Sequence, residues 1–337
     1  MAGTLHGFGL GVASKNAKGD VLDVFYPTPL ANISGDLVSI FDGVSGELKA
    51  TEIRALSDGL RSAGEHALAD IAVRLGEAGR PVVASLLADN AAPQTVADAY
   101  LKLHLLSHRL IKPHGTDLTG MFALLPNVAW TDEGPIDLAE LADRQLTSRL
   151  KGRVLEVASV DKFPKMTNYV VPSGVRIAHT ARVRLGAYLG SGTTVMHEGF
   201  INFNAGTDGP GMIEGRISAG VMVGKGSDLG GGCSTMGTLS GGGNIIISVG
   251  ESCLLGANAG LGIPLGDRCT VEAGLFVTAG TKVTVLDDAR EAVETLAARH
   301  LSGKSDLLFR RNSQSGSVEC LTNQTAIELN ESLHDNN

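Results

Sequence analysis

The sequence predicts a mainly β protein in which a parallel β-helix is flanked by an N-terminal α/β domain and a small C-terminal cap. Three observations predict this fold. More than half of the 44 glycines lie between Gly174 and Gly280. Within that stretch aliphatic residues recur every six positions, whereas the residues before it follow helical spacing. We therefore expect three domains, at 1–156, 157–286 and 287–337.

The six-residue repeat is the strongest signal. A small residue often follows its aliphatic position by four, as at Ala187 and Cys253. Such a pattern is typical of short strands joined by tight turns, with aliphatic side chains inside and small residues at the corners. These hexads are similar to those of left-handed parallel β-helices, and that similarity predicts the hand. The aliphatic positions are Ile177, Val183, Leu189, Val195, Ile201, Ile217, Val223, Leu229, Val249, Leu255, Leu265, Val271, Val277 and Val283.

Three breaks interrupt the repeat, at residues 202–215, 234–244 and 260–264. A stack of regular repeats needs no loops between its strands. We therefore interpret the breaks as insertions that mark the binding face. The first break ends in Glu214-Gly215-Arg216, and we expect a long flexible loop beside Glu214.

In the N-terminal domain the spacing of apolar residues predicts three helices, over 51–75, over 93–111 and from Asp137 to residue 152. The apolar runs at 21–27 and 121–130 are interpreted as strands. After the repeat we expect a helix at 287–300 and two strands around a Ser-Gly turn at 307–321. This cap would close the open end of the β-helix.

Composition excludes several classes of function. The net charge of −8 argues against a nucleic-acid coat or a polybasic membrane binder. The four cysteines form no CxxC pair, so we expect reduced, buried thiols. The first residues lack the pattern of a signal peptide, and no apolar run is long enough to span a membrane, so we expect a soluble cytoplasmic protein.

The repeat contains two histidines, His179 and His197, too few for the three zinc ligands of a β-helical carbonic anhydrase. His197 remains a candidate general base for acetyl transfer. Glu214 is the other candidate, because Arg216 lies two residues away and glycine allows close approach of a ligand. A carboxylate there could attack an acyl donor or accept a proton from an amine.

Several long strings carry a resemblance, including MIEGR, GGGCS, GANAG, VEAG, TAGT and RRNS. Together they resemble the tetrahydrodipicolinate N-succinyltransferase family in its actinobacterial-type branch, from about Val157 to Ser313. The resemblance implies transfer of the succinyl group of succinyl-CoA to tetrahydrodipicolinate, on the way to diaminopimelate and lysine. It also implies a homotrimer with active sites between neighbouring β-helices.

The resemblance implies roles for individual residues as well. Glu214 matches the catalytic glutamate, proposed to form an acyl-anhydride. The other matching residues are those that contact the acyl donor, succinyl-CoA. The implied succinyl-CoA contacts are Arg216, Gly231, Ser234, Ala257, Glu272, Ala273, Gly280, Arg310, Arg311, Asn312 and Ser313.

The family also places a structural metal on the trimer axis, through an aspartate before RVRLG and the glutamate of HEGF. Here Glu198 is present, but Ala181 replaces the aspartate. Glu198 is therefore the single residue that matches a ligand of such a Mg²⁺ ion.

Two rival interpretations stay open. Another CoA-dependent acyltransferase, with an acetyl donor or an amino-sugar acceptor, would share the fold and depend on a histidine base such as His197. A non-enzymatic scaffold subunit would use the β-helix for assembly alone. Neither residue types nor spacing decide whether Glu214 acts as covalent carrier or as base.

Overall fold

The computed structural model describes residues 4–237 and 245–322 and divides the chain into two compact units. The first holds the chain up to residue 111 together with 115–164 and 168–170. The second holds 112–114, 165–167 and the chain from 171 onward. Among the described residues no helix is long and apolar enough to cross a membrane.

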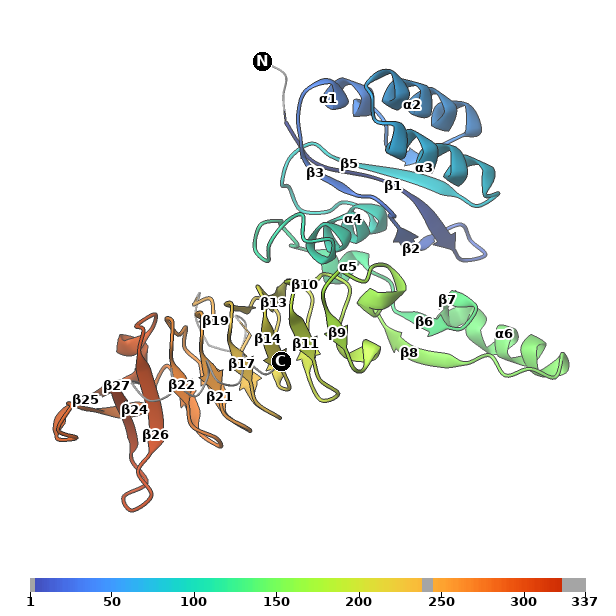
Figure 1. The fold of residues 1–337 in the computed structure, drawn as a ribbon. Helices are drawn as coiled ribbons and strands as arrows, with labels where there is room; N and C mark the ends of the chain where they lie inside the picture. Colours follow the sequence, from blue (N-terminus) through green and yellow to red (C-terminus); the bar gives the residue numbers. More distant parts are fainter. Residues whose placement is uncertain (1–3, 238–244, 323–337) are drawn as a thin grey trace. The chain divides into compact units, whose positions relative to one another are not determined.

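The first unit is built on an antiparallel sheet around β1, which pairs with β2, β3 and β5. In Figure 1, α2 and α3 cover one face of this sheet and α4 the other. A second sheet, in the order β7-β6-β8, carries α6. The elements are β1 (Leu5–Lys15), β2 (Val21–Phe25), β3 (Leu30–Ile33), α1 (Asp36–Phe41), β4 (Gly46–Glu47), α2 (Ala50–Ser62), α3 (His66–Glu77), β5 (Val82–Leu87), α4 (Val96–Ser107), α5 (Met121–Leu124), β6 (Val128–Thr131), β7 (Gly134–Asp137), α6 (Leu138–Leu150) and β8 (Val157–Asp161).

The predicted helices of this unit are present, with one difference. The stretch 51–75 forms two helices, because Gly64 adopts a φ of 82° and ends the first of them. Asp137 caps α6 through a hydrogen bond from Ala139 N, as the sequence predicts. The run at 121–130 begins as the short helix α5 and becomes a strand only at β6.

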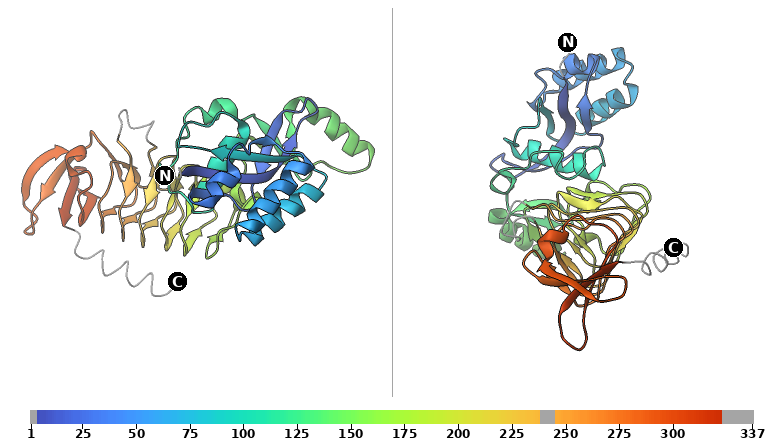
Figure 2. Two further views of the ribbon diagram at one scale, coloured as in Figure 1. Left: turned by 90° about the horizontal axis from the view of Figure 1, so that it is seen from above. Right: turned by 90° about the vertical axis from the view of Figure 1, so that its left-hand side faces the viewer.

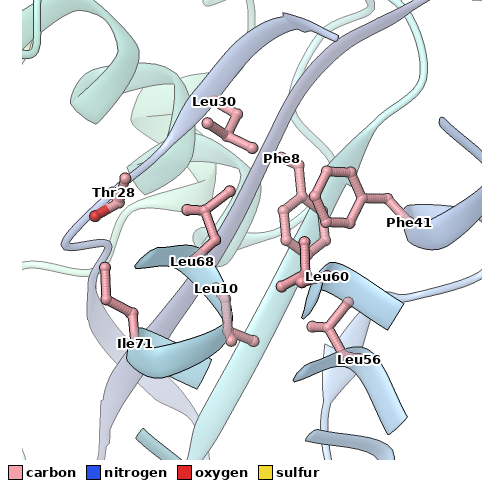
Figure 3. A pocket seen from close by; sticks show the side chains of 9 residues that line it. All are labelled: Phe8, Leu10, Thr28, Leu30, Phe41, Leu56, Leu60, Leu68 and Ile71. Carbon is pink, nitrogen blue, oxygen red and sulfur yellow. The ribbon is translucent and has the colours of Figure 1, made fainter. Parts of the chain in front are cut away.

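A small cavity lies between β1 and the helices α2 and α3 (Figure 3). Its volume is about 20 Å³, and its lining is almost entirely apolar. A space of this size holds about one water molecule, and an apolar one stays dry. This cavity is therefore a packing defect of the core rather than a substrate site. Its lining residues are Phe8, Leu10, Thr28, Leu30, Phe41, Leu56, Leu60, Leu68 and Ile71.

The second unit consists of short parallel strands stacked into three sheets, which appear as three walls when viewed along the stack (Figure 2, right). The ten-stranded sheet begins with β9 (Arg176–Ile177), β11 (Thr193–Val195), β14 (Gly211–Ile213), β17 (Asp228–Leu229), β20 (Leu254–Leu255) and β22 (Thr270–Val271). The four-stranded sheet holds β10 (Ala187–Leu189), β13 (Ala205–Thr207), β16 (Met222–Val223) and β19 (Ser248–Val249). We call the third the Arg216 sheet; it holds β12 (Phe200–Ile201), β15 (Arg216–Ile217), β18 (Ser234–Thr235), β21 (Gly260–Gly262) and β23 (Phe276–Thr278).

The hexad repeat determines this stacking. Every aliphatic repeat position except Ile177 is buried. Val195 pairs with Ile213, three hexads later, so one coil contains one strand of each sheet. The four cysteines are free and buried, as predicted.

The breaks in the repeat differ from the prediction. Residues 202–215 do not form an inserted loop, because β13 and β14 lie within them and stack in register. The phase shifts because Ile213 and Ile217 are four positions apart instead of six. The third break is a similar shortening, between Leu261 and Leu265. The second break is longer than a hexad, and residues 238–244 within it lie outside the described residues.

The C-terminal segment extends the ten-stranded sheet, since β26 pairs with β22 in parallel. The predicted hairpin is present as the antiparallel pair of β26 and β27. The helix predicted at 287–300 is wrong: this stretch forms β25, antiparallel to β24, followed by a short 3₁₀ turn. Pairing with β24 overrides the helical pattern. β25 is largely exposed, so its one charged residue, Glu294, stays in water. These elements are β24 (Lys282–Leu286), β25 (Ala292–Ala297), β26 (Leu307–Arg311) and β27 (Val318–Thr322); the 3₁₀ turns are Met166–Asn168, Thr180–Arg182 and Ala298–Leu301.

The close stacking of the coils gives the first testable prediction. A Cβ atom on Gly190 would overlap the backbone oxygen of Asp208 on the next coil. Overpacking of this kind costs about 1–3 kcal/mol, so Gly190→Ala should lower the free energy of unfolding by that amount in denaturant titrations.

Gly59→Ala is the control. Gly59 lies inside α2, and the nearest atom to its Cβ would be Cγ2 of Ile40 at 3.6 Å. Alanine there should stabilise the protein by about 0.5–1 kcal/mol. A Gly190→Ala variant as stable as the unmodified chain would contradict the stacking described above.

Candidate active site

Glu214 occupies the shortened corner between β14 and β15. Only three residues separate the buried Ile213 and Ile217, and Arg216 already belongs to β15, so the turn between the two sheets is reduced to Glu214 and Gly215. The Glu214 amide donates to the Leu229 carbonyl at 2.8 Å. The backbone of Glu214 is thereby fixed to the next coil rather than placed beside a flexible loop.

The Glu214 carboxylate is half-buried and available for chemistry. It makes no hydrogen bond or ion pair to the part of the chain that the structure describes. Its Oε2 atom lies 3.6 Å from the position that a Cβ on Gly231 would take. Residue 231 therefore lies directly beside the carboxylate, at van der Waals distance.

Gly215 and Cys233 shape the same corner, and the sequence analysis did not assign either to the site. A Cβ on Gly215 would overlap Sγ of Cys233 and lie 2.6 Å from its carbonyl oxygen. Burial, and then the nearby charge of Glu214, raise the pKa of Cys233 to about 12. The thiol is thus protonated and serves packing. The four-position spacing of Ile213 and Ile217 was a signal for Gly215; Cys233 lies on the next coil and is brought there by the stacking.

Arg216 begins β15 and points along the Arg216 sheet toward the neighbouring strand. Its Nε and Nη2 atoms donate to Oγ of Ser234 at 3.1 and 2.5 Å. Arg216 forms no salt bridge within the described ranges, and its side chain is exposed. A hydroxyl cannot neutralise a guanidinium, so this cation is free to bind an anionic group.

Four of the residues predicted to contact succinyl-CoA lie on later coils at the same corner as Glu214: Gly231, Ala257, Glu272 and Ala273. We call this corner, which joins the ten-stranded sheet to the Arg216 sheet, the Glu214 edge. Along it the Asn258 amide donates to the Gly231 carbonyl at 2.9 Å, and the Gly274 amide to the Ala257 carbonyl at 2.8 Å. Each step between stacked strands is about 4.8 Å. The edge thus carries small residues from Glu214 past Gly231 and Ala257 to Ala273.

The hairpin of β26 and β27 meets the far end of this edge. The Arg311 amide donates to Oε2 of Glu272 at 2.6 Å. Arg311 itself is exposed, and among residues 4–237 and 245–322 its Nη1 atom donates only to the Gly316 carbonyl, at 2.9 Å. Its remaining donors are available for an anion.

Four other predicted residues behave differently. Arg310 forms a salt bridge to Glu319 at 2.9 Å, and Asn312 donates to the other Glu319 oxygen at 2.7 Å. The Asn312 hydrogen bond and then Arg310 lower the pKa of Glu319. Both side chains therefore hold the hairpin. Ser313 is exposed in the turn, and Gly280 is exposed with open space around it.

The residues around Glu198 do not fit a metal site within one chain. Its two oxygens are taken by Arg182, at 3.0 Å, and by Nδ1 of His197, at 2.7 Å. The His197 hydrogen bond and then the charge of Arg182 lower the pKa of Glu198. Ala181 supplies no ligand. Among residues 4–237 and 245–322 there is no group of three or more His, Cys, Asp or Glu that could hold an ion.

Family models match two parts of the chain. One described as tetrahydrodipicolinate N-succinyltransferase middle matches residues 125–165, and one described as hexapeptide repeat of succinyl-transferase matches residues 246–279. The second match covers Ala257, Glu272 and Ala273 of the Glu214 edge.

Full-length relatives agree with these matches. A Pseudomonas aeruginosa protein named 2,3,4,5-tetrahydropyridine-2,6-dicarboxylate N-succinyltransferase is 63% identical over 345 residues, covering 100% of both chains. A Vibrio cholerae protein of the same name is 58% identical over 337 residues, covering 98% of both.

A solved structure shares the fold across both units. It is a Campylobacter jejuni protein provisionally described as a 2,3,4,5-tetrahydropyridine-2-carboxylate N-succinyltransferase. The TM-score is 0.86 at 32% identity, with 96% of this chain and 93% of that chain covered. Identity and coverage at these levels show that this chain belongs to the tetrahydrodipicolinate N-succinyltransferase family.

Proposed function

We propose that this protein transfers the succinyl group of succinyl-CoA to the amino group of tetrahydrodipicolinate in its open-chain form, 2-amino-6-oxopimelate. The products are N-succinyl-2-amino-6-oxopimelate and CoA, within the diaminopimelate and lysine pathway. The full-length identity to enzymes of this name carries the proposal. The Glu214 carboxylate has no hydrogen-bond or ion-pair partner in the part of the chain that the structure describes and lies on an edge of small residues, which supports the proposal chemically.

The chemistry needs a proton acceptor and close positioning. In one route the neutral amine attacks the thioester carbonyl carbon, the amide bond forms and the C–S bond breaks, while Glu214 accepts the proton that the amine loses and passes it to the departing thiolate. In the other route the Glu214 carboxylate attacks the thioester carbonyl carbon and the CoA thiolate leaves, which gives an anhydride. The amine then attacks the succinyl carbonyl of this anhydride, the Glu214 carboxylate leaves, and the amine proton passes to the released carboxylate or to the thiolate. In both routes, holding the reactants together supplies up to about 7–11 kcal/mol.

Donor recognition follows the Glu214 edge. The small residues Gly231, Ala257 and Ala273 allow an extended pantetheine arm to approach the backbone. Arg216, near Glu214, binds the carboxylate of the succinyl group, and Arg311, at the far end, binds phosphate of CoA. Arg310 and Asn312 act through the hairpin instead, since Glu319 occupies them.

The proposal extends to winding, assembly and location. We propose that the stacked sheets wind with a left hand, as in the hexapeptide-repeat proteins that the sequence resembles, and that the enzyme is a homotrimer. CoA thioesters are cytoplasmic metabolites, so we place the enzyme in the cytoplasm. The metal role of Glu198 is not part of the proposal, because Arg182 and His197 occupy its carboxylate. The branch of the family stays a prediction.

Exchanging the carboxylate of Glu214 tests the proposed chemistry. Glu214→Gln removes the base or nucleophile while keeping the shape, so kcat should fall about 10²- to 10⁴-fold. The measurement is CoA thiol release from succinyl-CoA with tetrahydrodipicolinate.

His197→Ala serves as the comparison, because His197 is exposed and hydrogen-bonded to Glu198. Its activity should stay within about twofold of the unmodified enzyme, as is usual for surface changes. The reverse order of effects would favour the histidine-based acyltransferase and overturn the role of Glu214.

The preference of the enzyme for succinyl-CoA over acetyl-CoA tests the proposed role of Arg216. Losing a hydrogen bond to a charged group costs about 1.5–3 kcal/mol, so Arg216→Ala should weaken succinyl-CoA binding about 10- to 100-fold. Acetyl-CoA lacks the terminal carboxylate and should lose much less affinity. Calorimetric titration of both ligands checks this, with the exposed Lys225→Ala on another corner as control. Equal losses for both ligands would show that Arg216 does not bind the succinyl carboxylate.

A further inference from the structure

Phe276 is a large apolar side chain left half exposed on the Arg216 sheet. Its exposed fraction is 50%, although it begins β23 only three residues after Ala273 of the Glu214 edge. The sequence analysis gave it no role, and the residues directly before and after it, Leu275 and Val277, are buried and pack inward.

Phe276 belongs to one outward-facing column of the sheet. Arg216 pairs with Ser234, Ser234 with Gly260, and Gly260 with Phe276. These four residues therefore lie on successive coils, about 4.8 Å apart. The column runs parallel to the Glu214 edge, because each of its strands begins where a turn of that edge ends.

The Phe276 ring folds back along this column. A Cβ on Gly260 would overlap Cδ2, Cε2 and Cγ of Phe276, so the ring occupies the space that any other residue at 260 would fill. Arg216 leans the opposite way, with Nε and Nη2 on Ser234. The guanidinium and the ring thus converge over Ser234 and Gly260 from the two ends of the column.

The guanidinium of Arg216 and the ring of Phe276 together match the chemistry of an acyl-CoA. The guanidinium suits an anionic group next to Glu214, and the ring offers an apolar face one coil beyond Ser234. The pantetheine arm of an acyl-CoA has both an adjoining acyl end and an extended chain with apolar segments. A ring packed on glycine presents its face with few rotamers open to it, so little conformational entropy is lost on binding.

We propose that Phe276, packed on Gly260, is a binding residue for the pantetheine arm of succinyl-CoA. This inference rests on the proposed function. Gly260 is part of the device, because a side chain there would lift the ring from the column and turn it away from Ser234.

Truncated donors test the proposal. The Phe276→Ala variant is compared with the unmodified enzyme on succinyl-CoA, succinyl-pantetheine and succinyl-N-acetylcysteamine. Removing an apolar contact of this size should raise KM about 5- to 20-fold for the first two donors, which share the whole arm. KM for the short N-acetylcysteamine thioester, and kcat at saturating donor, should change less than about twofold.

A binding measurement and matched variants separate a contact from a structural role. By calorimetry, Phe276→Ala should weaken binding of CoA itself, and Phe276→Leu should recover most of the affinity. Phe122→Ala is the control, since Phe122 is 56% exposed on α5 of the other unit and should leave CoA affinity unchanged. Gly260→Ala should mimic Phe276→Ala; thermal unfolding of every variant identifies any that fails to fold.

Three outcomes would overturn the proposal. The first is unchanged CoA affinity in a folded Phe276→Ala variant. The second is an effect limited to succinyl-CoA, which would place the ring against the nucleotide. The third is a change of oligomeric state by light scattering with unaltered KM, which would make the ring an interface residue. If the unmodified enzyme bound no CoA and released no thiol, the proposed function would fail instead.

Discussion

The structure depends on the distance between stacked coils. Parallel strands about 4.8 Å apart leave room for a turn only where the facing residues are small or absent. Gly190 faces the Asp208 carbonyl, Gly215 faces Cys233, and Gly256 would place a Cβ 2.5 Å from the Ala273 amide. The high glycine content of the second unit is therefore a requirement of close packing, more than of positive φ angles. The same requirement produces the smooth edge along which an extended cofactor arm fits.

The number of residues in a turn of the β-helix determines where the reactive side chains lie. Most turns keep the hexad spacing, and the turn at Glu214 is shortened by two residues. A shortened turn has little conformational freedom, and the hydrogen bond from the Glu214 amide to Leu229 removes more of it. Such a site is held by rigid elements, which suits a reaction that depends mainly on positioning. An inserted loop would have given the carboxylate more freedom and less precision.

Charge pairing separates structural from functional groups in this protein. Glu198 is held by Arg182 and His197, and Arg310 by Glu319, so these charges stabilise local structure. Glu214 and Arg216 have no charged partner among the residues that the structure describes. A half-buried carboxylate and an exposed guanidinium that lack charged partners and lie two residues apart are candidates for contact with a ligand. Residue type alone did not reveal this difference, since all were equally plausible as site residues.

The sequence by itself determined the stacked β architecture, because buried aliphatic residues at six-residue spacing leave few other ways to form a core. It also identified the family. The structure places the small residues Gly231, Ala257 and Ala273 on one edge, and their contact with succinyl-CoA stays a prediction. Tertiary structure alone decided the rest. It showed that the first break is a shortened turn, that β25 pairs with β24 instead of forming a helix, and that the Phe276 ring packs on Gly260. Each of these features depends on contacts with a segment that is distant in the sequence. The local periodicity of a sequence carries no information about such contacts.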